Sequence, residues 1–169
     1  MSAATVKSRY EHFSFLHQDF FESYQVVNQY VSELYTKPKK FISETSPALN
    51  NLLREISIPR SPEKNNPVAG GVVEFISELD KFTVETVQLF EAHKNHVSES
   101  VNYLNEINRL KTENKGKKMY DFALDYIQLT PQLHKLNNGL TQIKLNADNM
   151  ADKLELLELR WERIKRKMQ

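Results

Sequence analysis

Residues 119–168 read MYDFALDYIQLTPQLHKLNNGLTQIKLNADNMADKLELLELRWERIKRKM, and they decide the fold. Their apolar positions alternate steps of three and four residues without a slip, which places them on one stripe of a helix that follows a heptad. The stripe consists of Met119, Phe122, Tyr126, Leu129, Leu133, Leu136, Leu140, Ile143, Ala147, Met150, Leu154, Leu157, Trp161, Ile164 and Met168. A continuous helix of this length would extend roughly 75 Å at 1.5 Å per residue. The pattern therefore predicts a long helix over residues 118–167.

Two helix breakers lie inside this predicted helix, Pro131 and the triplet Asn137-Asn138-Gly139. A true reversal of the chain at Asn-Gly would create a fourth helix. The heptad phase passes both breakers without losing a residue, and a turn has no reason to preserve that phase. We therefore expect one continuous, kinked helix, with a break as the alternative.

A second helix is predicted over residues 4–36, where the same spacing recurs with one polar occupant, His17. Its stripe consists of Val6, Tyr10, Phe13, His17, Phe20, Tyr24, Val27, Val31 and Leu34. Lys37-Pro38 should end or kink this helix, because proline lacks a backbone donor and restricts the preceding residue. A short helix over residues 47–56 should follow, capped by Ser46 and with Pro47 in its first turn. Residues 57–71 hold three prolines and two glycines and are predicted as a loop.

The third long helix is predicted over residues 72–112, and its apolar surface is wider than a coiled-coil seam. Three columns repeat at intervals of seven residues and lie side by side. They consist of Phe75, Phe82, Leu89, His96, Tyr103 and Leu110; of Ile76, Thr83, Phe90, Val97 and Leu104; and of Val72, Leu79 and Ile107. Such an arc indicates a central helix with more than one neighbour. The polar segment 114–118 contains Gly116 and suits a tight reversal after it.

These elements predict an all-α fold in a single domain over residues 1–169. The expected arrangement is an elongated antiparallel three-helix bundle, or coiled coil, with long kinked helices and the short extra helix between the helices predicted at 4–36 and 72–112. The composition agrees, with 40% hydrophobic and 27% charged residues. The chain has no cysteine, which excludes disulfides and thiolate metal sites. It shows neither a secretory signal nor an apolar run of 18 residues, so we expect a cytoplasmic protein.

Catalytic signatures are missing from the sequence. Under the bundle alignment His17, His96 and His134 fall within about two helical turns of one another, but no Glu-x-x-His or HExxH motif accompanies them. No phosphate loop or nucleophile elbow occurs either. We therefore expect no enzyme activity, no metal and no cofactor. A net charge of +1 without a recognition motif also makes nucleic acid an unexpected partner.

Surplus apolar residues lie off the main stripes and indicate a surface that binds another helix. The candidate interface consists of Tyr120, Leu124, Ile127, Leu145, Leu156, Leu159 and Trp161. The alternative for the off-stripe residues is a wider internal stripe, and for Trp161 an ordinary place in the core. The leading hypothesis is a scaffold, adaptor or complex subunit that forms a homodimer or hetero-oligomer with helical partners.

Three basic clusters support a competing hypothesis. They consist of Lys37, Lys39 and Lys40; of Lys115, Lys117 and Lys118; and of Arg163, Lys165, Arg166 and Lys167. Basic tips on a helical bundle could bind anionic lipid, each cation contributing on the order of 1 kcal/mol. Kinked three-helix hairpins resemble membrane-binding modules of the BAR type in architecture, which implies a dimeric peripheral membrane protein. The simpler explanation is that cations favour helix C-termini and exposed turns.

Two serine-proline pairs, at Ser46 and Ser61, fall in the region expected to be irregular. A phosphate at either site would be exposed and readily accommodated. Serine-proline is equally ordinary in turns, so the sequence leaves phosphorylation open.

Overall fold

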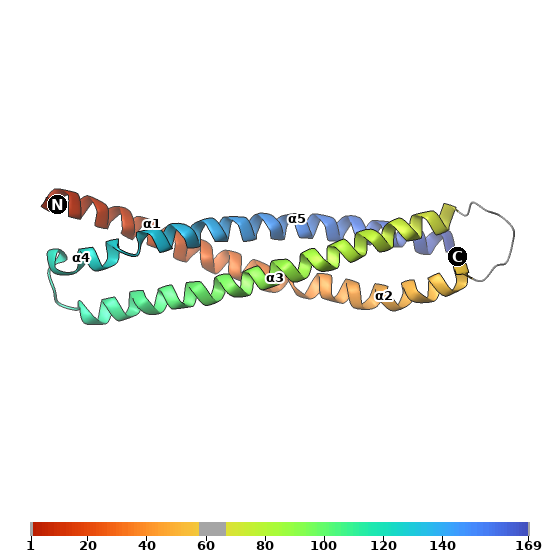
Figure 1. The fold of residues 1–169 in the computed structure, drawn as a ribbon, viewed down its shortest axis with the longest axis horizontal. Helices are drawn as coiled ribbons and strands as arrows, with labels where there is room; N and C mark the ends of the chain where they lie inside the picture. The colour runs from red at the N-terminus through yellow and green to blue at the C-terminus, as the bar shows by residue number, and fades with distance from the viewer. Residues whose placement is uncertain (1, 58–66, 169) are drawn as a thin grey trace. The chain divides into compact units, whose positions relative to one another are not determined.

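The computed structural model describes residues 2–57 and 67–168. Within these ranges the chain is helical and contains no strand, so the all-α prediction is confirmed for the described residues (Figure 1). The helices are α1 (Ala3–Leu34), α2 (Thr36–Ser57), α3 (Pro67–Glu113), α4 (Met119–Ile127) and α5 (Thr130–Met168).

The chain divides into two compact units. Unit 1 comprises Met1–Val31 and Glu91–Leu145, and unit 2 comprises Ser32–Phe90 and Asn146–Gln169. Helices α3 and α5 therefore contribute one part of their length to each unit. The prediction that residues 1–169 form a single domain stays a prediction.

The core of unit 1 joins α1, α3, α4 and α5. Phe20 on α1 has its ring centroid 5.8 Å from that of Tyr103 and 6.4 Å from that of His96, both on α3. At the other end of α1, Val6 packs with Ala123 and Ile127 of α4. His17 of α1 contacts Tyr103 of α3, whereas Asn28, later in α1, contacts His93, earlier in α3, so these two segments are antiparallel.

The core of unit 2 joins α2 with the other parts of α3 and α5. Phe75 stacks on Trp161 with ring centroids 5.6 Å apart. Glu78 pairs with Arg160, and Glu85 pairs with Lys153 further along α3. The partner of Glu85, which comes later in α3, comes earlier in α5 than the partner of Glu78, so these segments are antiparallel. On α2 the apolar face faces the core, where Leu49 and Leu52 are buried.

The predicted apolar stripes are the buried ones over most of their length. On α5 every stripe position from Leu133 to Ile164 is buried. On α3 the column that begins at Phe75 is buried throughout, and the column that begins at Ile76 is half-buried. The wide apolar arc predicted for this helix is therefore confirmed.

The short helix predicted at residues 47–56 is in fact α2, which begins at Thr36. Lys37-Pro38 was expected to end the first helix, and α1 does end nearby, at Leu34. Pro38, however, lies in the first turn of the next helix, where backbone N–H groups have no intrahelical partner and a missing donor costs nothing. Ser46 is inside α2 and does not cap a helix start.

The long helix predicted over residues 118–167 is bent, as expected, but it is not continuous, because Gln128 and Leu129 form a turn between α4 and α5. Pro131 has no N–H to donate to the carbonyl oxygen of Ile127, and Leu129 N instead donates to Tyr126 O at 2.9 Å, one residue closer than in an α-helix. Gln128 keeps right-handed helical angles, so the chain bends rather than reverses. The triplet Asn137-Asn138-Gly139 is helical, as expected for a continuous phase.

The predicted loop over residues 57–71 is shorter at its end. Residues 67–71 belong to α3, which begins with proline at a position where its fixed φ suits a helix start. Ser57 is the last residue of α2. The remaining loop positions, with Ser61, lie outside the described residues.

The segment 114–118 forms the predicted reversal between α3 and α4. Lys117 N donates to Asn114 O at 3.0 Å, and Gly116 has φ +83°, in the left-handed region that favours glycine. The backbone conformation therefore favours glycine at this position.

Replacing Gly116 by alanine should lower the free energy of unfolding by about 1 kcal/mol, because alanine is strained at this φ. Gly71→Ala is the matched control: it lies within α3, a Cβ there meets no atom within 4 Å, and alanine should stabilise the helix by up to about 1 kcal/mol. Urea unfolding followed by circular dichroism measures both. Equal effects of the same sign at the two glycines would contradict this account of the turn.

Candidate interaction surfaces

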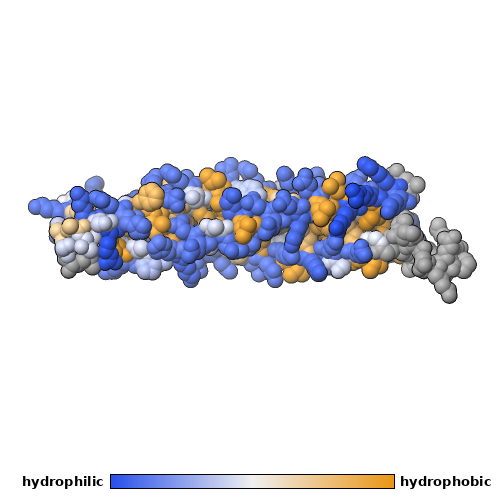
Figure 2. All heavy atoms as spheres, turned by 90° about the horizontal axis from the view of Figure 1, so that it is seen from above, coloured by the Kyte–Doolittle hydropathy of each residue, from blue (hydrophilic) through white to orange (hydrophobic). Residues whose placement is uncertain are grey.

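Exposed apolar side chains occur on α5 in unit 2, where Leu156 is 49% and Leu159 57% exposed. On the face drawn in Figure 2, hydrophobic residues form small separate patches between hydrophilic ones. A contact made through such a patch would bury a limited apolar area. A contact on that face is therefore suited to the insertion of single side chains rather than to a broad flat interface.

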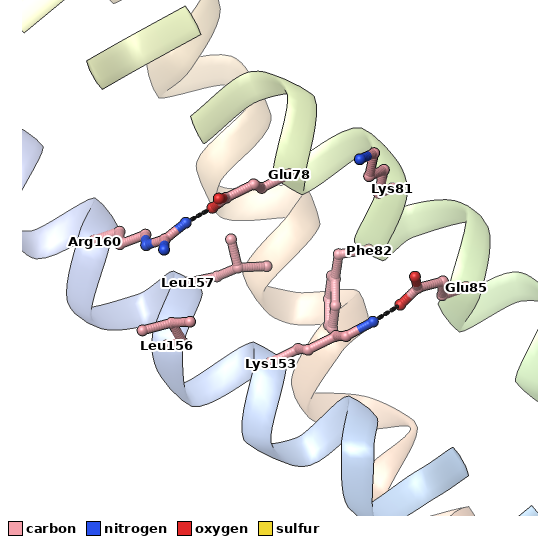
Figure 3. Close-up of a pocket in the computed structure, with 8 residues that line it drawn as sticks. All are labelled: Glu78, Lys81, Phe82, Glu85, Lys153, Leu156, Leu157 and Arg160. Atoms are coloured by element: carbon pink, nitrogen blue, oxygen red, sulfur yellow. Dashed lines mark hydrogen bonds and ion pairs between the residues drawn. The ribbon is translucent and has the colours of Figure 1, made fainter. Parts of the chain in front are cut away.

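A groove between α3 and α5 lies beside Leu156 (Figure 3). Phe82 and Leu157, both buried, contribute its apolar part. The ion pairs Glu78–Arg160 and Glu85–Lys153 cross from one helix to the other, one on each side of these apolar residues in Figure 3. Because the paired side chains are about half exposed, each pair adds no more than about 1 kcal/mol. Their main effect is to flank an apolar recess with fixed charges.

A second groove lies between α2 and α5, and Leu159 is on its edge. Its lining mixes both signs of charge: Lys37, Lys40, Phe41, Glu44, Thr45, Ala48, Glu155, Glu158, Leu159, Trp161, Glu162 and Lys165. Lys165 pairs with Glu162 at 2.6 Å and Lys40 pairs with Glu44 at 4.0 Å. Basic residues predicted to contact anions therefore share this groove with carboxylates.

The remaining basic residues are exposed. Lys115, Lys117 and Lys118 occupy the reversal between α3 and α4, and the C-terminal cluster is on the last turns of α5. Lys39 lies over the Tyr35 ring, 5.7 Å from its centroid. None of the helices in the described residues is both long and apolar enough to cross a membrane.

Two of the seven candidate interface residues are buried against their own chain. Ile127 is 5% exposed and packs with Val6 and Ala123, because the bend after α4 turns it toward α1. Trp161 is 9% exposed and stacks on Phe75, so it occupies the core of unit 2. We remove both from the candidate interface.

The other five candidates are exposed but are not gathered at one place. Tyr120, Leu124 and Leu145 belong to unit 1, while Leu156 and Leu159 belong to unit 2. Leu124 lines a groove at the α4–α5 bend together with Arg9, Gln128 and Pro131. Whether any of the five contacts a partner stays a prediction.

Three exposed valines on the part of α3 that belongs to unit 2 were missed. Val73, Val84 and Val87 lie on one side of α3 in unit 2, outside the three apolar columns. Valine is a weak helix former, so its use at exposed helix positions is a signal in itself. Their spacing of eleven and three residues could have been found in the sequence.

The predicted neighbourhood of His17, His96 and His134 divides into separate contacts. Nε2 of His96 donates to the carbonyl oxygen of Leu136 at 2.9 Å, and Nδ1 lies 3.4 Å from the Ser100 hydroxyl. His134 instead lies beside His12, with ring centroids 6.4 Å apart. Among the described residues no group of three histidine or carboxylate side chains is arranged to hold a metal ion.

His17 and His93 each bond across to another helix of unit 1. Nδ1 of His17 lies 2.7 Å from the Tyr103 hydroxyl, and Nε2 of His93 donates to Asn28 Oδ1 at 2.8 Å. Burial and the charge of Lys111 lower the pKa of His17. Burial and the neighbouring His96 lower the pKa of His93. Both rings are therefore favoured in their neutral form by the folded state.

Comparison with protein-family models, with curated proteins and with solved structures finds no match.

Gly139 allows the close approach of α5 to His96, since an added Cβ would lie 3.1 Å from His96 Cδ2. Gly139→Ala should therefore lower the free energy of unfolding by about 1 kcal/mol despite the better helix propensity of alanine. In a His96→Ala background the clash is gone, and the same substitution should stabilise by about 1 kcal/mol. Thermal and urea unfolding of wild type, the two single variants and the double variant give the double-mutant cycle. An identical effect in both backgrounds would contradict it.

Acidification should destabilise unit 1 through His17 and His93. A pKa held below its ordinary value of 6.5 means that the unfolded chain binds protons more readily, so this contribution is present above pH 6.5 and is lost as pH falls. The melting temperature should drop between about pH 7 and pH 5, and His17→Phe with His93→Gln should flatten that slope. An unchanged slope in the double variant would assign the pH dependence to other groups.

Proposed function

We propose that this chain is a non-catalytic scaffold or complex subunit that binds helical segments of protein partners. The observation that carries the proposal is the pair of exposed leucines on α5, Leu156 and Leu159, each on the edge of a groove. Residues spaced by three on one helix are the usual anchors of helix-to-helix recognition. An amphipathic partner helix would cover them and place an apolar side chain against Phe82 and Leu157.

The expected energy fits a specific but modest contact. Full burial of a leucine contributes roughly 1.5–3 kcal/mol, and these two are already about half covered. Covering the rest of both would contribute on the order of 2 kcal/mol. Further affinity would have to come from neighbouring charges or from additional surface, such as Val84 and Val87 on α3.

We propose in addition that the long helices form one elongated antiparallel three-helix bundle. The antiparallel pairing of α1 with α3 in unit 1 and of α3 with α5 in unit 2 supports this arrangement. So does the fact that α3 and α5 each run through both units. A bundle of this kind offers long helical faces, and we propose no catalytic role for it.

We favour a protein partner over an anionic membrane surface. Three of the lysines in the candidate basic clusters, Lys37, Lys40 and Lys165, share one groove with four glutamates. A negatively charged bilayer would meet both signs there, which weakens its attraction to that surface. A cytoplasmic location likewise stays a prediction.

Affinity capture from the native cell tests the proposal. Wild type should retain a defined set of proteins, and Leu156→Glu with Leu159→Glu should lose them, since each change removes apolar contact and adds a charge that must be desolvated. A purified partner should bind the double variant at least about tenfold more weakly.

The matched control places two glutamates at exposed positions with the same spacing on α3, Asn105→Glu with Asn108→Glu. It should retain the captured set. If wild type and both double variants retain the same proteins, or if wild type retains none, the proposed function is wrong. Circular dichroism must show equal helix content in all three proteins.

A further inference from the structure

A second heptad follows the solvent side of α5 in unit 2. Its positions alternate steps of three and four residues, as the buried stripe does, but all of them are exposed. This outer face of α5 consists of Asn149, Asp152, Leu156, Leu159, Arg163 and Arg166. Two leucines therefore occupy its centre, with a carboxylate before them and guanidinium groups after them.

The charges of the outer face have no partner within the described part of the chain. Neighbouring cations on the same helix do pair: Lys153 with Glu85, Arg160 with Glu78 and Lys165 with Glu162. In contrast, the side chains of Asp152 and Arg163 make no ion pair or hydrogen bond with another described residue. The outer face thus keeps one negative and one positive end available.

We propose that this face pairs with the same face of a second copy of the chain in antiparallel orientation. This inference rests on the proposed function and names the partner of that site. A two-fold axis between Leu156 and Leu159 brings Leu156 against Leu159 of the second copy, and Leu159 against its Leu156. The same axis brings Asp152 against Arg163 of the second copy, twice by symmetry.

Charge complementarity selects this orientation. The flanking positions Asn149 and Arg166 also face each other across the axis, where the amide oxygen can accept from the guanidinium group. A parallel pair would instead align Asp152 with Asp152 and Arg163 with Arg163, which places like charges together at the seam. The groove between α3 and α5 borders this face at Leu156, so that side of the seam is open to a partner side chain.

The size of the face sets the expected strength. Four half-exposed leucines, two from each copy, and two ion pairs that remain at the surface amount to less than a standard protein interface. We therefore expect weak, reversible dimerisation with a dissociation constant on the order of 100 micromolar. The dimer should form in the full chain without any other protein.

Charge reversal across the interface provides the test. Sedimentation velocity of the full chain from about 1 to several hundred micromolar should show a monomer–dimer equilibrium. Asp152→Arg and Arg163→Asp alone should each raise the dissociation constant about tenfold, because two opposite pairs become two like pairs. Together the two changes restore opposite charges across the axis and should return the constant to within about threefold of wild type.

The control is Glu99→Arg, which makes the same change of charge at an exposed position on α3 and should leave the equilibrium unchanged. A chain that stays monomeric throughout the range overturns the self-pairing, as does a dimer that both single reversals leave intact or that the double reversal does not restore. The proposed function has a separate readout: if the chain is monomeric and capture still depends on Leu156 and Leu159, the partner is a different protein. Circular dichroism excludes unfolding as the cause in each variant.

Discussion

Helix α3 carries an apolar arc that is too wide for one neighbouring helix to cover, and the packing of both units depends on that constraint. In unit 1, Tyr103 meets α1 while His96 reaches the backbone of α5. In unit 2, Phe75 meets Trp161 of α5, and Phe90 meets Tyr35 from the turn that precedes α2. In each unit, therefore, two other segments of the chain pack against α3 to cover its apolar arc.

The polar residues in the middle of this arc make the packing in unit 1 specific. His96 and Ser100 are buried on α3, and a buried polar group is costly unless it is hydrogen-bonded. His96 finds its acceptor on the backbone of α5 only because that helix comes close enough, and Gly139 is the residue that permits the approach. The hydrogen bond and Gly139 therefore both favour one register of α5 against α3. In another register the His96 ring would lose this acceptor, and Gly139 would no longer lie opposite the ring.

Periodicity in the sequence predicted the buried stripes, because apolar burial repeats with the helix itself. It did not predict the ends of the helices. Pro38 and Pro47 were expected to mark a boundary and a start, yet both lie within α2, since a proline is tolerated in a first turn and one lost hydrogen bond can be offset by burial of Leu49 and Leu52. The sequence pattern predicted that Ile127 lies on the surface. In the structure the break at Gln128 and Leu129 changes which side of α4 faces α1, and Ile127 is buried there. A heptad pattern carries no information about such a change, because phase survives a short turn.

The buried stripe and the outer face of α5 have the same spacing of three and four residues. They differ in their side chains, which are apolar on the buried stripe and partly charged on the outer face. The inner stripe from Leu133 to Ile164 holds no charged residue, so exposing it to water would be opposed along its whole length. The outer face has two leucines between Asp152 and Arg163, and each charge there is well solvated when the face is uncovered. A contact on that side gains little over its hydrated state, and salt weakens its ion pairs. The inner stripe therefore holds the helix in its fold while the outer face remains solvated, as the proposed reversible self-pairing requires.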